Sequence, residues 1–108
     1  MGFDHNWCLN TYRHGKGNDK VVAASLYSPQ TGIKLEVFTD EPGLQAYTGN
    51  FLDGSFAGKH GYRYPRHASV CLETQHYPDS PNKPQWPSPY LKPGEVYHSH
   101  CVYKFSAK

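Results

Sequence analysis

The histidines and cysteine near the C-terminal end form the densest cluster of residues that could bind a metal ion. His98 and His100 flank a serine, and Cys101 follows directly. Strand alternation would place both histidines on one face, as a two-histidine metal site requires. No third or fourth ligand follows at a recognisable spacing. We therefore interpret these histidines as solvent-facing and predict no metal site.

Nucleophilic catalysis has less support in the sequence. No serine or cysteine sits in a glycine-flanked turn of the kind that exposes a nucleophile. The three cysteines are odd in number and form no CxxC pair, which argues against a disulfide framework and a structural zinc site. Taken alone, Asp4-His5-Asn6 reads most simply as a turn, because Asp and Asn side chains bind nearby backbone groups.

Carbohydrate binding makes the most use of the composition, which includes nine Tyr, five Phe and two Trp. Aromatic rings can pack on the C–H surface of a sugar, while carboxylates and amides bind its hydroxyls. The candidates for the first task are Trp7, Tyr47, Tyr62, Tyr64 and Trp86, and those for the second are Asp4, Gln45 and Glu73. Glu73 lies within a predicted strand, where acidic residues are depleted. Partial desolvation there would suit it to general base catalysis, because burial raises the pKa of a carboxyl group.

The elements that must position these residues are strands joined by turns. Residues 21–27 and 34–39 predict a hairpin around a turn at 28–32, with Leu35 and Val37 facing away from Lys34 and Glu36. Residues 48–61 are predicted to be mainly loop. Residues 78–93 hold six of the nine prolines and predict an extended excursion at the surface or at a sheet edge.

Two further segments carry the candidate site residues. Residues 44–47 alternate so that Gln45 and Tyr47 share a side, and residues 69–75 place Glu73 on the face of Gln75. A last strand is predicted at residues 96–105. The prevalence of aromatic, Gly and Pro residues makes an all-β fold the expectation.

Length and charge exclude several classes of protein. The chain has 108 residues, enough for one domain, and a formal net charge of +2 with scattered basic residues. A nucleic-acid surface needs clustered cations, so no nucleic-acid partner is predicted. No apolar run approaches a membrane span and no signal pattern is present, which predicts a cytoplasmic location and no membrane partner.

Five blocks of the sequence together resemble one known family. They are Gly2-Phe3-Asp4-His5-Asn6, residues 35–45 (Leu-Glu-Val-Phe-Thr-Asp-Glu-Pro-Gly-Leu-Gln), residues 47–54 (Tyr-Thr-Gly-Asn-Phe-Leu-Asp-Gly), Cys71-Leu72-Glu73-Thr74-Gln75 and Leu91-Lys92-Pro93-Gly94-Glu95. Their order and spacing are similar to those of the aldose 1-epimerases, also called galactose mutarotases.

The resemblance implies an antiparallel β-sandwich that interconverts the α and β anomers of free aldoses such as glucose and galactose without a cofactor. It implies that Glu73 is the general base that takes the C1 hydroxyl proton, and that Asp4 and Gln45 bind sugar hydroxyls. Ring opening also needs an acid to protonate the ring oxygen. In the family that acid is a histidine.

The resemblance also implies that residues 1–108 match only the C-terminal part of a single, longer domain. The family's acid histidine, a second histidine and a substrate-binding arginine belong to blocks upstream of Asp-His-Asn. We therefore expect the isolated chain to be a fragment or short form with impaired activity. The alternative is a non-catalytic sugar-binding or structural remnant. If the chain is active, His5 is the most plausible acid. A sheet cut partway would leave free strand edges open to self-association.

Overall fold

Antiparallel strand pairing accounts for nearly all regular structure in the computed structural model, which describes residues 1–108. The strands are β1 (Asp4–Cys8), β2 (Tyr12–Arg13), β3 (Lys16–Gly17), β4 (Ala24–Tyr27), β5 (Ile33–Thr39), β6 (Gly43–Tyr47), β7 (Cys71–Gln75) and β8 (Cys101–Ala107). Two single turns of 3-10 helix, η1 (Lys59–Gly61) and η2 (Ser80–Asn82), interrupt the loops. The all-β prediction is confirmed.

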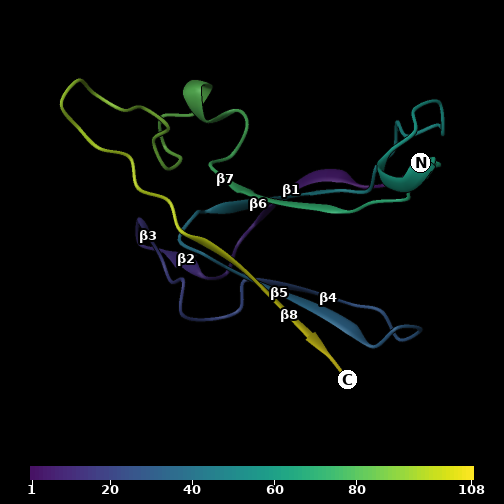
Figure 1. Cartoon of the computed structure of the whole chain (residues 1–108). Coiled ribbons are helices and arrows are strands. Elements are labelled where there is room, and N and C mark those ends of the chain that lie inside the picture. The colour runs from purple at the N-terminus through teal and green to yellow at the C-terminus, as the bar shows by residue number, and fades with distance from the viewer.

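The strands form two three-stranded sheets and one small ribbon (Figure 1). The first, here called the site sheet, has the order β1-β6-β7 and is antiparallel throughout. The second, here called the hairpin sheet, has the order β4-β5-β8. Its β4–β5 pair is the predicted hairpin. Strands β2 and β3 pair only with each other.

The core lies where the two sheets face each other. Val37 from the hairpin sheet packs with Leu44 and Leu72 from the site sheet and with Leu9, and all four are buried. Alternation explains the choice, because Leu44 and Leu72 lie on the opposite face of their strands from Gln45 and Glu73. The apolar face of the site sheet thus packs in the core, and its polar face points outward.

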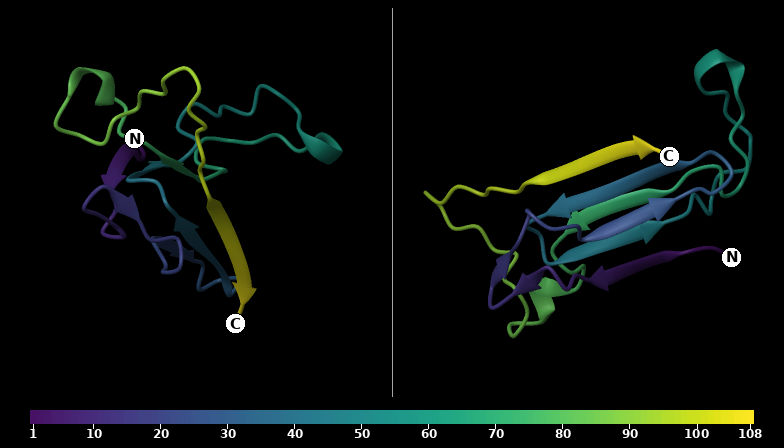
Figure 2. Two further views of the ribbon diagram at one scale, coloured as in Figure 1. Left: turned by 90° about the vertical axis from the view of Figure 1, so that its left-hand side faces the viewer. Right: turned by 90° about the horizontal axis from the view of Figure 1, so that it is seen from below.

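The two layers diverge away from this core (Figure 1), and much apolar surface stays exposed. Only 11 of 108 residues are buried. The radius of gyration is 16.5 Å, larger than the roughly 13 Å expected for a compact domain of this length. Strand β8 lies at the outer edge of its sheet (Figure 2), and all seven of its residues are exposed.

Two predictions about local structure are wrong. Asp4-His5-Asn6 is not a turn but the start of β1, because its backbone pairs with β6. The last strand begins at Cys101 rather than at residue 96. The residues before it serve other contacts: His100 N–H donates to Asp40 Oδ1 at 2.9 Å, and the Tyr97 hydroxyl donates to Glu41.

The loops agree better with the sequence. Residues 48–61 are loop apart from η1, and residues 78–93 form no strand but hold η2, turns and irregular backbone. Figure 2 shows the loop that carries η1 projecting away from the sheets. No helix is long and apolar enough to span a bilayer.

Candidate functional site

The outward face of the site sheet gathers polar side chains from all three strands. Directly paired residues of antiparallel strands point to the same face. Asn6 pairs with Gln45, and Gln45 pairs with Glu73. The residues on this face, here called the site face, are Asp4, Asn6, Cys8, Gly43, Gln45, Tyr47, Cys71, Glu73 and Gln75. The register therefore brings Asp4, Gln45 and Glu73 to one face.

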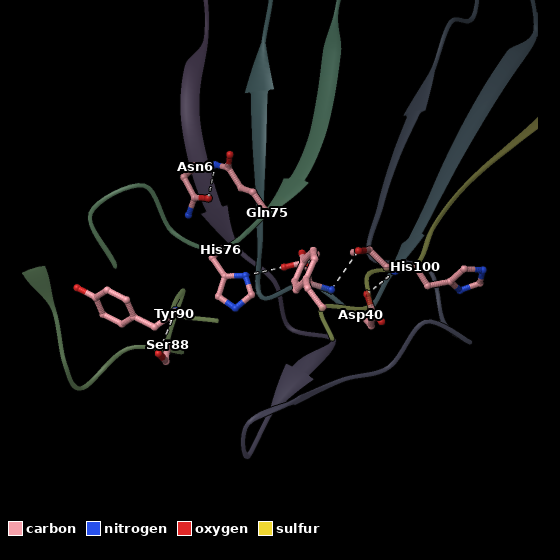
Figure 3. Close-up of polar contacts among 10 residues, drawn as sticks. Asn6, Asp40, Gln75, His76, Ser88, Tyr90 and His100 are labelled. Atoms are coloured by element: carbon pink, nitrogen blue, oxygen red, sulfur yellow. Dashed lines mark hydrogen bonds and ion pairs between the residues drawn. The ribbon is translucent and has the colours of Figure 1, made fainter. Parts of the chain in front are cut away.

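A hydrogen-bonded network joins four of these side chains. Gln45 Nε2 donates to Asp4 Oδ1 at 2.8 Å. Gln75 Nε2 donates to Gln45 Oε1 and to Asn6 Oδ1, both at 3.0 Å. Figure 3 shows Asn6 and Gln75 reaching toward each other from the two outer strands, across the central strand. Neither Asn6 nor Gln75 was predicted as a site residue, although Gln75 follows Glu73 at strand spacing.

Glu73 is the free carboxylate of the site face. It forms no hydrogen bond or ion pair with the rest of the chain, and its residue is exposed. The partial desolvation expected from its position in a strand is therefore wrong for this chain, because Glu73 is exposed even though Cys71 and Gln75 on the same face of β7 are half-buried. The arrangement leaves its oxygens open to a proton or a ligand.

The predicted aromatic residues do not gather around the carboxylates. Only Tyr47 belongs to the site face, whereas Trp7 alternates to the opposite face of β1. Tyr62 and Tyr64 lie against each other in the loop, with ring centroids 6.2 Å apart. Trp86 packs edge-on against Tyr77 at 5.5 Å. Aromatic composition alone could not identify which rings share a surface.

Tyr77 is an aromatic neighbour of the site that the sequence did not single out. A Cβ atom added to Gly43 would meet Asn6 Oδ1 at 2.6 Å and Tyr77 Cδ1 at 2.9 Å. The missing side chain at Gly43 thus lets this ring and the Asn6 amide lie over β6. Burial, followed by a hydrogen bond with Cys8, raises the pKa of Tyr77.

A cavity of about 610 Å³ opens at the Asp4 end of the site face. Besides Asp4, its lining includes His5, Asn50, Phe51, Arg66 and His67. His67 Nδ1 lies 2.9 Å from the Thr48 carbonyl oxygen. The cavity therefore adds a cation and an imidazole near Asp4, both on the loop before β7.

The remaining histidines do not converge on Glu73. His5 lies on the face of β1 opposite to Asp4 and Asn6. His76 Nδ1 lies 2.9 Å from Glu41 Oε2, and His100 Nδ1 lies 2.6 Å from Asp19 Oδ2. No group of three His, Cys, Asp or Glu side chains is arranged to hold a metal ion. His98 and His100, expected on one strand face, precede β8 and are not in a strand.

Comparison with known proteins identifies the family. The family model for aldose 1-epimerase matches residues 1–104. The chain belongs to the aldose 1-epimerase family. It is 49% identical over 105 residues to mouse galactose mutarotase and 40% identical over 109 residues to Escherichia coli aldose 1-epimerase. It also resembles the crystal structure of a GalM/aldose epimerase homologue from C. elegans, with a TM-score of 0.80 and 28% identity.

These relatives are much longer than the chain. The match covers 97% of this chain but 29% of the mouse protein, and 99% of this chain but 30% of the E. coli protein. For the C. elegans structure the shares are 97% and 30%. The family's antiparallel β fold is therefore present in a chain that spans about three tenths of these relatives.

Proposed function

We propose that this chain carries the general-base half of a mutarotase site for free hexoses such as galactose and glucose. Glu73 takes the proton from the C1 hydroxyl, while Asp4 and Gln45 bind other hydroxyls. The observation that carries the proposal is the register that opposes Gln45 and Glu73. Cβ atoms of such directly opposed residues lie about 5 Å apart, a span that one sugar ring can bridge.

The chemistry explains what Glu73 can do and what it lacks. When the base removes the C1 hydroxyl proton, the C1 oxygen becomes a carbonyl oxygen and the bond from C1 to the ring oxygen breaks. The ring oxygen must gain a proton from an acid, and ring closure on the other carbonyl face gives the second anomer. His5, the expected alternative acid, lies across β1 from Asp4. We therefore propose that water supplies this proton when residues 1–108 act alone.

The expected result is weak activity, because a positioned proton-transfer group contributes a factor of about 10² to 10⁴. Polarimetry of freshly dissolved α-D-galactose tests this. We expect a small acceleration over buffer that Glu73→Gln removes and Glu95→Gln retains, since Glu95 is exposed and outside both sheets. Turnover comparable to a full-length relative, or equal acceleration by Glu73→Gln, would contradict the proposal.

A non-catalytic sugar-binding or structural remnant is the second candidate, favoured by the exposed Glu73 and the absence of a histidine beside it. Galactose titration followed by backbone amide NMR separates the two. Shifts at Gln45 and Glu73 without any acceleration would assign a binding role. No shifts and no acceleration would assign a structural role.

The cytoplasmic location stays a prediction.

Self-association through free strand edges is also part of the proposal. Strand β8 is an edge strand exposed along its whole length, and β1 and β7 are the edges of the site sheet. Unpaired edges offer backbone donors and acceptors to a second copy. Sedimentation over a range of concentrations should give an average mass that rises with concentration. A constant monomer mass would contradict it.

A further inference from the structure

The site face contains three side-chain amides whose orientations depend on one another. Asp4 accepts from Gln45, Gln45 accepts from Gln75, and Asn6 accepts from Gln75. A carboxylate has no hydrogen to donate, so Gln45 must turn its NH₂ group toward Asp4. The order of donors and acceptors across the whole network follows from that first contact.

Gln75 is the link between the two other amides. Because Gln45 turns its NH₂ group to Asp4, its carbonyl oxygen faces Gln75. Gln75 must therefore donate an N–H to that oxygen. The second N–H of Gln75 points to Asn6 Oδ1. Both donors of Gln75 are therefore used inside the network, while its carbonyl oxygen stays free.

The free groups that remain suit a polyhydroxyl ligand. Asn6 keeps both amide N–H groups free, and Gln45 keeps one. The second oxygen of Asp4 and both oxygens of Glu73 remain as acceptors. Sugar hydroxyls donate and accept at once, so a surface with donors from Asn6 and Gln45 and acceptors from Asp4 and Glu73 can satisfy them in pairs.

We propose that Gln75 is a positioning residue that fixes the amides of Gln45 and Asn6 so that their N–H groups face the sugar. This inference rests on the proposed function for the ligand, but not for the orientation of the amides. Gln75 itself does not touch the reacting atoms. Its half-buried position at the end of β7 restrains it, whereas Asp4 at the end of the network is exposed.

The protein without sugar provides the first test. Side-chain amide hydrogen exchange and ¹⁵N relaxation should find both Gln75 amide hydrogens protected, both Asn6 amide hydrogens unprotected, and the Gln45 amide as ordered as its backbone. Free rotation of the Gln45 amide in the wild-type chain would overturn the proposal. This measurement needs no variant and no sugar.

Two substitutions then separate orientation from packing. Gln75→Glu keeps the size of the side chain but removes both donors, and Gln75→Met removes the amide altogether. Gln75→Met should make the Gln45 amide more mobile than in the wild type, because only its bond to Asp4 remains, and both variants should raise the galactose Kd about tenfold, as expected for misoriented donors. Gln30→Met, in the turn before β5, is the matched control and should change neither quantity.

The outcomes distinguish this inference from the proposed function. A Gln45 amide that is as ordered in Gln75→Met as in the wild type would overturn the positioning role, whatever the sugar does. Absence of any galactose effect on the wild-type site face would overturn the proposed function, while the relaxation data still decide the role of Gln75. A purely packing role would lower stability in Gln75→Met but leave the galactose Kd of Gln75→Glu unchanged.

Discussion

Asp4 and Glu41 each anchor a network of polar side chains beside β6, but only the Glu41 network is built on a buried carboxylate. Asp4 and its three amide neighbours lie on the site face with several free donors and acceptors. Glu41 lies just before β6 and is 3% exposed. Its neighbours are Tyr97, from the segment just before β8, and His76, which directly follows β7 (Figure 3 labels His76).

The carboxylates of Asp4 and Glu41 differ in the groups they contact. Glu41 Oε1 accepts from the Tyr97 hydroxyl, while Oε2 has no well-aligned hydrogen bond but lies 2.9 Å from His76 Nδ1. We interpret the Oε2 contact as an ion pair when His76 is protonated, because the distance suits one. A buried carboxylate needs such partners to offset its desolvation. The Glu41 network therefore supports the fold, and the Asp4 network remains available to a ligand.

Glu41→Ala should give the largest effect on stability. It removes a buried carboxylate and with it the acceptor of the Tyr97 hydroxyl, so we expect a loss of about 1.5 to 3 kcal/mol in unfolding free energy, the range for a hydrogen bond to a charged group. Urea unfolding followed by tyrosine fluorescence measures it. Glu95→Ala, at an exposed position, is the control. A loss below about 0.5 kcal/mol would mean that both networks are equally open to water.

Asp4→Asn should have the opposite profile. Because Asp4 is exposed, we expect a change in unfolding free energy of less than about 1 kcal/mol. The galactose Kd should rise about tenfold, because an amide at residue 4 can donate and no longer dictates the orientation of Gln45. Urea unfolding and an NMR titration of the same sample compare the two effects. A large stability loss with unchanged affinity would reverse the contrast with Glu41.

Alkaline pH should weaken two tyrosine contacts, that of Tyr97 in the Glu41 network and that of Tyr103 with the Leu72 carbonyl. The hydrogen bond to Glu41, and then burial, raise the pKa of Tyr97 above the ordinary 10.0. Burial, followed by nearby negative groups that include Glu73, raises the pKa of Tyr103. Folding thus favours the neutral phenols, so their contribution to stability is complete below pH 10 and is lost as the pH rises through the raised values.

Tyrosinate absorbance and the urea midpoint, followed together above about pH 10, measure this loss. Tyr97→Phe lacks one ionising hydroxyl and should lose less stability over the same range. A wild-type urea midpoint that stays unchanged while both tyrosines ionise would contradict this expectation.

The smallest effect should come from acid at Asp19. A hydrogen bond from His100 is the main cause that lowers the pKa of Asp19 below 3.8. A lowered pKa means that the contribution to stability is present above the unfolded value and is lost as the pH falls through the folded value. Between about pH 4 and pH 2, Asp19→Asn should therefore lose less stability than the wild type. Equal slopes of the urea midpoint would contradict this.

The sequence predicted the strands better than the contacts between them. Alternation in residues 34–39 was enough to turn Val37 inward, and the same rule put Gln75 on the face of Glu73. The prediction of a turn at Asp4 was wrong because pairing with β6 outweighs the local preference of Asp and Asn for turns.

Contacts between distant segments carry no local signal. The Glu41 network brings together Glu41, His76 and Tyr97 from three parts of the chain. The sequence predicted Tyr97 to lie in the last strand because its neighbours alternate. The amide network depends on the register of β1, β6 and β7, which no single segment encodes. The specific roles predicted for Glu73 and Gln45 therefore rest on the family resemblance rather than on periodicity.

The outer position of β8 has a consequence for the order in which the chain folds. Tyr27 pairs with Lys34 across a short turn. Thr39 pairs with Cys101, and the chain between them includes two strands of the site sheet and the proline-rich residues 78–93. Closing so long a loop is slow, because its entropy is lost before the contacts form. We expect the β4–β5 hairpin to form early and β8 to join last. An exposed last strand should also be first to leave, so its amides exchange with solvent through local opening long before the core unfolds.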